Sequence, residues 1–414
     1  MYKVLDRNSV CDYLRSIPAV VDVLNNMDSL EVAEIGDGNL NFVYRVSNSD
    51  DTSRSVILKQ AVPYLRMVGE EWPLGRDRMT YEIRALMVYN QLVPNFVPQI
   101  YHSDESMSTL VMQCLGDHII LRHGLIEGKQ YPDVGRHIGE FLAETLFRTS
   151  AFSMDSQARR QLMDRFTLNA ELCKLTEEFI FTFPYMEHDS NYSNPPTDRW
   201  AREHLRSNSE YKLNVLKFKE LFITKTDALL HADLHTGSLM VNQSESYVID
   251  MEFAYFGPFG FDVGKIMANF WMCATSHLHR STDHTMVNWL INQSFVIWQV
   301  FSSRFLKLWA NMTESAMLIP DLLSETELNE YKRRFMQKLL QETVGFAACC
   351  LARRTLGIAG VADIRGIEDP EIRSKLEIIN LQISMLLMKR HDSLVDIEDV
   401  VTLISDFYHA QPNI

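Results

Sequence analysis

The chain has 414 residues, a formal net charge of −14, 46% apolar residues and 23% charged residues. This length and apolar content can bury sizeable cores in two lobes, and the negative charge argues against a nucleic-acid surface. Neither an apolar stretch of 18 residues nor a secretory N-terminal pattern occurs, so no membrane span or export signal is predicted. The six scattered cysteines are predicted to be reduced thiols.

The first predicted element is a hairpin over residues 31–46, in which two alternating apolar and polar runs flank Gly36, Asp37, Gly38 and Asn39. The pattern predicts a strand, a tight turn and a second strand. Glycines in such a turn let backbone amides approach a phosphate closely, because no side chain stands in the way. Taken alone, the turn also fits an ordinary hairpin.

Three further elements follow along the chain. Residues 56–61 form a short apolar strand that carries Lys59, and residues 76–90 form a candidate amphipathic helix that carries Glu82. Residues 108–118 are predicted to be a buried strand that breaks at a glycine. A lysine at a strand end is usually a solvated edge charge. Lys59 is a candidate functional residue only because its strand follows the glycine turn in the chain.

Residues 231–264 place two acidic residues where a phosphotransfer site needs them. Asp233 begins a D-x-x-x-x-S run, and Asp250 ends a short apolar stretch and is followed by Glu252. The apolar runs between the two aspartates predict a β-hairpin that returns both to the same end. In phosphoryl transfer one carboxylate orients and deprotonates the attacking hydroxyl, and another holds the metal that bridges the nucleotide phosphates. The alternative is a helix cap and a turn residue.

A core-lining helix is predicted over residues 335–354, because apolar side chains recur on one helical face. Arg353 and Arg354 lie at its end, where arginine also compensates the helix dipole. Residues 186–200 are predicted to be a long surface loop. Residues 277–284 contain three histidines, which could suggest zinc, although a polar turn explains them equally well.

The segments HADLHTGS and DMEFAYFGPFGFDVG resemble the catalytic and metal-binding loops of the aminoglycoside phosphotransferase and choline kinase group, small-molecule relatives of the protein kinases. Together with the KQA-P-Y and E-WPL-R elements of residues 59–78, they are similar more narrowly to the S-methyl-5-thioribose kinase family. Two departures occur in the first segment. The wider group usually has Gly where Ala232 stands and Asn where Ser238 stands.

The resemblance implies an α+β, bilobal protein-kinase-like fold. A small mixed N-lobe with an antiparallel sheet is expected over residues 1–115, and a larger, mainly helical C-lobe over residues 116–414. The implied reaction is ATP-dependent phosphorylation of the anomeric hydroxyl of 5-methylthioribose to the 1-phosphate, in methionine salvage. Another small-molecule kinase, for an aminoglycoside, choline or homoserine, and a regulatory pseudokinase stay open as alternatives.

ATP and Mg²⁺ are the implied cofactors, and a small-molecule sugar is the implied substrate. Neither a nucleic-acid partner nor a membrane partner is expected. The composition agrees with a soluble cytoplasmic enzyme, and relatives of this type are often homodimers. Asp233 is the implied catalytic base or orienting carboxylate, while Asp250 and Glu252 are the implied metal ligands. Lys59 and Glu82 fit the strand lysine that contacts the α/β-phosphates and the helix glutamate that pairs with it.

The resemblance also implies substrate contacts for Asp233, Arg353, Arg354 and Trp72, the last near a loop that covers the sugar pocket. The backbone from Gln113 to Leu115 would be the hinge that hydrogen-bonds adenine. The full set of residues implied for ATP is Gly36, Asp37, Gly38, Asn39, Asn41, Lys59, Glu82, Gln113, Cys114, Leu115, Asp250, Met251 and Glu252.

Overall fold

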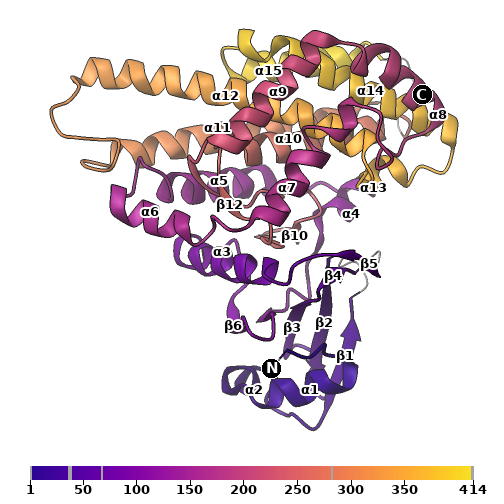
Figure 1. Cartoon of the computed structure of the whole chain (residues 1–414), viewed down its shortest axis with the longest axis vertical. Helices are drawn as coiled ribbons and strands as arrows, with labels where there is room; N and C mark the ends of the chain where they lie inside the picture. The colour runs from indigo at the N-terminus through magenta and orange to yellow at the C-terminus, as the bar shows by residue number, and fades with distance from the viewer. Residues whose placement is uncertain (1, 36–39, 67–68, 281–282, 412–414) are drawn as a thin grey trace.

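A computed structural model describes residues 2–35, 40–66, 69–280 and 283–411. A small antiparallel sheet with two helices lies at one end of the molecule and a larger body of helices lies at the other (Figure 1). This arrangement confirms the expected α+β fold class, whereas the boundary expected near residue 115 stays a prediction. The glycine turn expected at residues 36–39 lies outside the described residues.

The sheet has five antiparallel strands in the order β1-β2-β3-β7-β6. The strands predicted around the glycine turn and around Lys59 are therefore confirmed. Side chains alternate between the two faces, so that Tyr44 and Leu58 point into one buried cluster while Lys59 points to the other face. The strands are β1 (Leu30–Glu34), β2 (Asn41–Asn48), β3 (Ser55–Ala61), β6 (Ile100–Asp104) and β7 (Thr109–Gln113).

Helices α1 (Arg7–Arg15) and α2 (Pro18–Leu24) pack their apolar sides against the face that holds Tyr44 and Leu58. A capping box of Asp6 and Ser9 begins α1. The opposite face meets α3 (Arg78–Leu92), whose Glu82 is buried. A two-stranded hairpin of β4 (Tyr64–Leu65) and β5 (Gly69–Pro73) connects the sheet to α3 and carries Trp72.

The remainder of the chain is mainly helical. Its α-helices are α4 (Leu121–Ile126), α5 (Val134–Arg148), α6 (Ser156–Asp164), α7 (Ala170–Phe179), α8 (Pro195–Trp200), α9 (Ser209–Thr224), α10 (Gly260–His277), α11 (Thr285–Ala310), α12 (Glu325–Leu356), α13 (Ala362–Arg365), α14 (Pro370–Arg390) and α15 (Ile397–His409). Short 3₁₀ turns are η1 (Phe183–Tyr185) and η3 (His391–Ser393), and a π-helical turn is η2 (Ala201–Arg206). Among the helices that the structure describes, none is long and apolar enough to cross a membrane.

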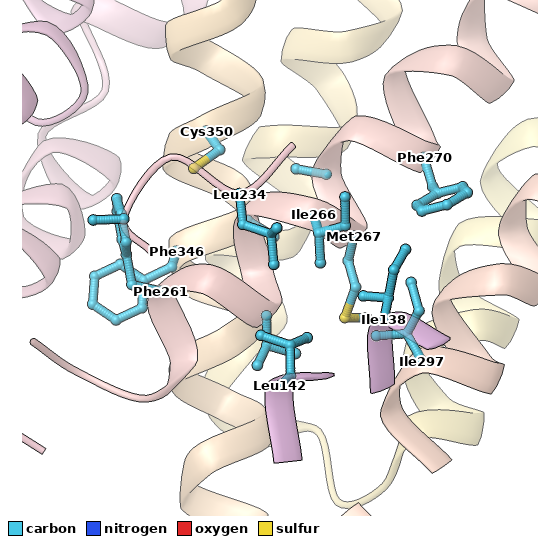
Figure 2. Close-up of a cluster of buried hydrophobic side chains, with 14 of the residues drawn as sticks. Ile138, Leu142, Leu234, Phe261, Ile266, Met267, Phe270, Ile297, Phe346 and Cys350 are labelled. Atoms are coloured by element: carbon cyan, nitrogen blue, oxygen red, sulfur yellow. The ribbon is translucent and has the colours of Figure 1, made fainter. Parts of the chain in front are cut away.

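Helix α10 is the centre of this helical body, and every residue from Gly260 to His277 is buried. It packs against α11 and α12, and a side chain at Gly264 would collide with the backbone carbonyl of Thr343, so only glycine permits this close approach. Figure 2 shows Leu234 pointing into the buried cluster that Leu142 of α5 and Ile266 of α10 line. The loop that carries Asp233 is thus anchored in the core.

Two short antiparallel pairs flank that loop. Strands β10 (Leu239–Val241) and β11 (Ser246–Val248) form the predicted hairpin, which β8 (Ile119–Ile120) extends. Strand β9 (Ala228–Leu230), just before the loop, pairs with β12 (Tyr255–Gly257). The predicted β-hairpin between the two aspartates is therefore confirmed.

Two local predictions need correction. The surface loop expected over residues 186–200 is wrong in its second half, because Pro195 opens α8 at a first-turn position that proline favours. The helix predicted over residues 335–354 begins earlier, at a capping box of Ser324 and Glu327.

The histidines of residues 277–284 were open to two interpretations, a zinc site and a polar turn. Within the described part of this segment, His277 ends α10 and its Nε2 bonds to the Leu125 carbonyl. The described residues of this segment form no group of three possible metal ligands.

Candidate active site

The loop after β9 and the loop after β11 carry the two predicted aspartates and are joined by hydrogen bonds. The Ile249 amide donates to the Ser238 carbonyl at 3.0 Å, and His231 Nε2 donates to the Ile249 carbonyl at 2.8 Å. His231 Nδ1 in turn accepts from the Asp233 amide at 3.1 Å. These bonds fix the two loops relative to each other, as the hairpin predicted.

Both loops contain a residue in left-handed backbone conformation. Ala232 has φ of 63° and Asp250 has φ of 66°, a region that alanine rarely adopts and that aspartate adopts more often. Buried Asp262, in the first turn of α10, holds the first loop by accepting from the His231 amide at 2.8 Å and the Ala232 amide at 2.9 Å. The glycine that the wider group has at position 232 suits this backbone.

The side of the site that faces the sheet gathers acidic residues around Lys59. Its Nζ lies 2.5 Å from Glu82 Oε1 and 2.6 Å from Asp250 Oδ1. Burial lowers the pKa of Lys59, but attraction to Asp250 and Glu82 outweighs burial and raises it. The structure therefore brings together the lysine and the glutamate that were predicted to pair.

Glu252 adds a third carboxylate to this group, which we call the acidic cluster (Lys59, Glu82, Asp250 and Glu252). Glu252 accepts from Asn41 Nδ2 at 2.9 Å and lies 3.8 Å from Arg78 Nε. Burial, and then the charge of Glu82, raises the pKa of Glu252 to about 7. Glu82 Oε2 is buried and has no hydrogen-bond partner in the described parts of the chain, and the Asp250 side chain is 45% exposed. This excess of carboxylate oxygen suits a hard divalent cation such as Mg²⁺.

The side that faces the helical body surrounds Asp233 with cations and donors. Lys265 of α10 contacts Asp233 Oδ1, Arg354 Nη2 lies 3.3 Å from the same oxygen, and His235 Nε2 lies 3.4 Å from Oδ2. Burial raises the pKa of Asp233, but Lys265 and then His235 outweigh burial and hold it well below its usual range. We call Lys265, Arg353 and Arg354 the basic cluster.

His235 acts as a neutral donor beside Asp233. Burial lowers the pKa of His235 to about 3, and its Nδ1 accepts from the Gly237 amide at 3.0 Å. The ring proton is therefore on Nε2, the nitrogen that faces the carboxylate.

Arg353 is the other arginine of the predicted pair, and within the described part of the chain it forms no ion pair with a carboxylate. Its Nη1 is buried without a hydrogen-bond partner among the described residues. Burial, and then the charge of Arg354, lowers the pKa of Arg353 to about 9. The guanidinium carbon lies 5.4 Å from the centre of the Phe179 ring, and the Trp72 ring lies 6.4 Å from Phe179. Trp72 and Arg353, far apart in sequence, therefore share an aromatic neighbour.

The remaining predicted residues lie around the acidic cluster or at the end of the sheet. Asn41 is buried and also accepts from Arg78 Nε at 3.0 Å. Met251 is buried in the core, so only its backbone can meet a ligand. The Gln113 amide already donates to the Gln99 carbonyl at 2.8 Å. Adenine would therefore depend on the Cys114 and Leu115 backbone.

Sequence reasoning missed Lys265, Asp262 and Arg122. For Asp262 and Lys265 a signal was available in the sequence. The two charges are three residues apart in the otherwise apolar helix α10, so they lie on one face of it. Arg122 of α4 donates to Thr236 Oγ1 at 3.2 Å and forms an ion pair with Asp363 at 3.3 Å. It thus braces the same loop from the other side.

Another polar group lies at the tip of the hairpin. Among the residues that the structure describes, Asp117, His118 and Glu245 place possible metal-ligand atoms within 4.8 Å of one another. His118 is buried and its Nδ1 lies within hydrogen-bond distance, 2.7 Å, of Asp117 Oδ1, so the group is also explained as a hydrogen-bonded polar cluster.

A family model described as the phosphotransferase enzyme family matches residues 31–278. A methylthioribose kinase from Geobacillus sp. (strain WCH70) is 39% identical over 389 residues, covering 93% of this chain and 92% of that protein. Methylthioribose kinase 1 from Oryza sativa subsp. japonica is 34% identical over 415 residues, covering 98% of this chain and 96% of that protein. Among solved structures, an ethanolamine kinase from Plasmodium vivax has 13% identity and a TM-score of 0.49, covering 92% of this chain and 89% of that one.

Proposed function

The chain belongs to the phosphotransferase enzyme family and, by its relatives, to the methylthioribose kinases, and from this premise we propose that it moves the γ-phosphoryl group of ATP to the anomeric hydroxyl of 5-methylthioribose. The small sheet and the large helical body are the two parts of the protein-kinase-like fold of this family. The product is 5-methylthioribose 1-phosphate, and the implied setting is methionine salvage.

The observation that carries the proposal is the opposite charge of the two clusters. An acidic cluster beside Lys59 suits the metal-bound phosphates of a nucleotide, and a basic cluster beside Asp233 suits the oxygens of an acceptor and of the transferring group. Phosphoryl transfer needs both surroundings, since the donor and the acceptor meet between them.

The contacts of Asp233, Lys59 and Arg353 support a separate role for each side chain. Asp233 accepts the hydrogen bond of the attacking hydroxyl and takes its proton as the new phosphate ester bond forms. Lys59 reaches the α/β-phosphates from its pair with Glu82. Arg353, which has an unpartnered buried nitrogen, binds oxygens of the sugar or of the transferring phosphoryl group.

Asp250 and Glu252 are the residues that would hold Mg²⁺, and the ion would neutralise charge on the nucleotide phosphates. The excess of carboxylates in the acidic cluster supports this assignment. ATP binding at the Cys114 and Leu115 backbone, a homodimer and a cytoplasmic location stay predictions. So do the phosphate contacts of the glycine turn and the division into two lobes near residue 115.

The basic cluster also bears on the identity of the acceptor. Lys265, Arg353 and Arg354 repel a cation, so choline and polycationic aminoglycosides are poor candidates. Trp72 and Phe179 add aromatic surface beside Arg353, which suits a neutral sugar with an apolar methylthio tail. A pseudokinase is disfavoured because Lys59, Glu82 and Asp250 are in contact.

The test is ATP turnover by the purified protein with 5-methylthioribose, choline, homoserine and an aminoglycoside in parallel. We expect turnover with the thiosugar alone, and its loss when the anomeric hydroxyl is replaced. A slightly longer alkylthio group should be tolerated, since one added methylene changes discrimination by only about 1–3 kcal/mol. Efficient turnover of choline together with none of methylthioribose would reject the acceptor but keep the kinase.

A further inference from the structure

Lys265 is a buried lysine on the central helix α10, and its side chain is only 4% exposed. Its ammonium contacts Asp233 Oδ1 and donates to the Ala232 carbonyl at 3.1 Å. A lysine is almost never buried to this extent unless it is paired. Its partner here is the carboxylate that we assign to the acceptor hydroxyl.

The two oxygens of Asp233 have different surroundings. Oδ1 accepts from Lys265 and also from Arg354 at 3.3 Å, so its lone pairs are engaged. Among the residues that the structure describes, Oδ2 has one long contact, 3.4 Å from His235 Nε2. Acceptor capacity therefore remains on Oδ2 and not on Oδ1.

We propose that Lys265 is a positioning residue for the phosphoryl transfer, which fixes Oδ1 of Asp233 so that Oδ2 receives the hydrogen bond of the acceptor hydroxyl. This inference rests on the proposed function and adds a residue to it. The reaction itself is unchanged: the hydroxyl oxygen bonds to phosphorus, ADP leaves, and the hydroxyl proton passes to Asp233.

Charged and titratable groups face Asp233 from several elements. They are Lys265 from α10, Arg353, Arg354 and Cys350 from α12, Arg122 from α4 and His235 from its own loop. Among these, Lys265 is the strongest influence that lowers the pKa of Asp233. Because Asp233 works as a carboxylate, activity is present above its pKa and is lost as pH falls through it. Without Lys265 that loss should begin at a higher pH.

The experiment compares Lys265→Met with the unaltered enzyme in kcat and KM from pH 3 to pH 9, because the pKa of Asp233 in the unaltered enzyme lies well below its usual range. We expect kcat to fall at least tenfold, with the KM for ATP within about twofold. The acid limb of kcat should move up by roughly 1–3 pH units, the range for loss of one close opposite charge. A purely structural role would lower stability or kcat without moving this limb.

Lys225→Met is the matched control, because Lys225 also forms internal ion pairs, with Asp227 and Glu342, away from Asp233. It should alter thermal stability and leave the acid limb in place. Lys265→Arg keeps the charge and should retain the original acid limb even if kcat is lower, which keeps the inference testable should the methionine variant not fold.

An unmoved acid limb in Lys265→Met, or unchanged kcat, would overturn the inference. A limb that moves in Lys265→Arg as far as in Lys265→Met would also overturn it. These results are distinct from failure of the proposed function, in which the unaltered enzyme would not phosphorylate methylthioribose at any pH.

Discussion

The acidic cluster and the basic cluster are built from opposite kinds of side chain, although hydrogen-bonded loops join them. Around Lys59 the carboxylates outnumber the cations, and burial with the charge of Glu82 raises the pKa of Glu252 to about 7. Around Asp233 the cations outnumber the carboxylates, and the pKa of Asp233 is held well below its usual range. The first cluster has an excess of negative charge, and the second has an excess of positive charge.

This difference indicates what each cluster is made to receive. A cation relieves the repulsion within the acidic cluster, and an anionic or oxygen-rich group satisfies the basic cluster. A phosphoryl group that leaves metal-bound ADP and joins a sugar hydroxyl crosses from one environment to the other. Variants that remove charge from one cluster at a time should therefore have separable effects on nucleotide and acceptor.

The largest effect is expected at Asp233. Asp233→Asn keeps the shape but removes the base, so kcat should fall by roughly 10²-fold or more, while Mg·ATP affinity, measured by titration calorimetry, stays nearly unchanged. Lys265 and Arg354 would then face a neutral amide. Near-normal turnover in this variant would remove Asp233 from the mechanism.

Asp250→Ala tests the role of the acidic cluster in nucleotide binding. The variant loses the exposed carboxylate of the acidic cluster, so Mg²⁺-dependent ATP binding should weaken along with turnover, by about tenfold or more in affinity. Titration of Mg·ATP into the variant, with Asp233→Asn as the control, checks this result. If affinity and activity are both unchanged, Asp250 is not a metal ligand.

Arg353→Met tests the role of the basic cluster in binding the acceptor. The substitution keeps an apolar stem against Phe179 and removes a buried guanidinium nitrogen for which the described residues offer no hydrogen-bond partner. The value of kcat/KM for the sugar should fall by roughly 10–10³-fold, with little change in ATP affinity. Tm should stay level or rise, because an unpaired buried charge is costly. A falling Tm with intact kcat/KM would assign Arg353 to the fold instead.

The smallest effect is expected at Ala232. Its φ of 63° costs an alanine about 1–2 kcal/mol, while glycine loses roughly 0.5–1 kcal/mol in backbone entropy. Ala232→Gly should therefore change the free energy of unfolding by at most about 1.5 kcal/mol, as measured in urea, with kcat within about twofold. Ala232→Val, with a β-branched side chain at the same buried position, should be clearly destabilising. Equal stability of the two variants would contradict the backbone argument.

The sequence predicted the parts of the site that depend on local spacing. Alternating apolar and polar residues located the strands on either side of the glycine turn, and short apolar runs located the strand of Lys59 and the hairpin between Asp233 and Asp250. The pairing of Lys59 with Glu82 was implied by the resemblance to kinase-like folds. These features are confirmed because each depends on neighbours within a few tens of residues.

The parts that escaped prediction depend on long-range packing. Lys265 reaches Asp233 only because α10 passes beneath the loop, and Arg353 meets Phe179 across 174 positions of sequence. Spacing contains no information on such contacts. The helix at Pro195 was missed for a different reason, because a polar, proline-bearing stretch is equally typical of a loop and of a capped helix start.

Helix α10 holds the loop of Asp233 through Asp262 and Lys265, and every residue of that helix is buried. The amide hydrogens of His231 and Ala232 are therefore bonded to a part of the molecule that cannot open by itself. They should exchange with solvent deuterium as slowly as those of the core. Heat should release this loop only when the helical body itself melts, because the loop is bonded to the buried helix at the centre of that body.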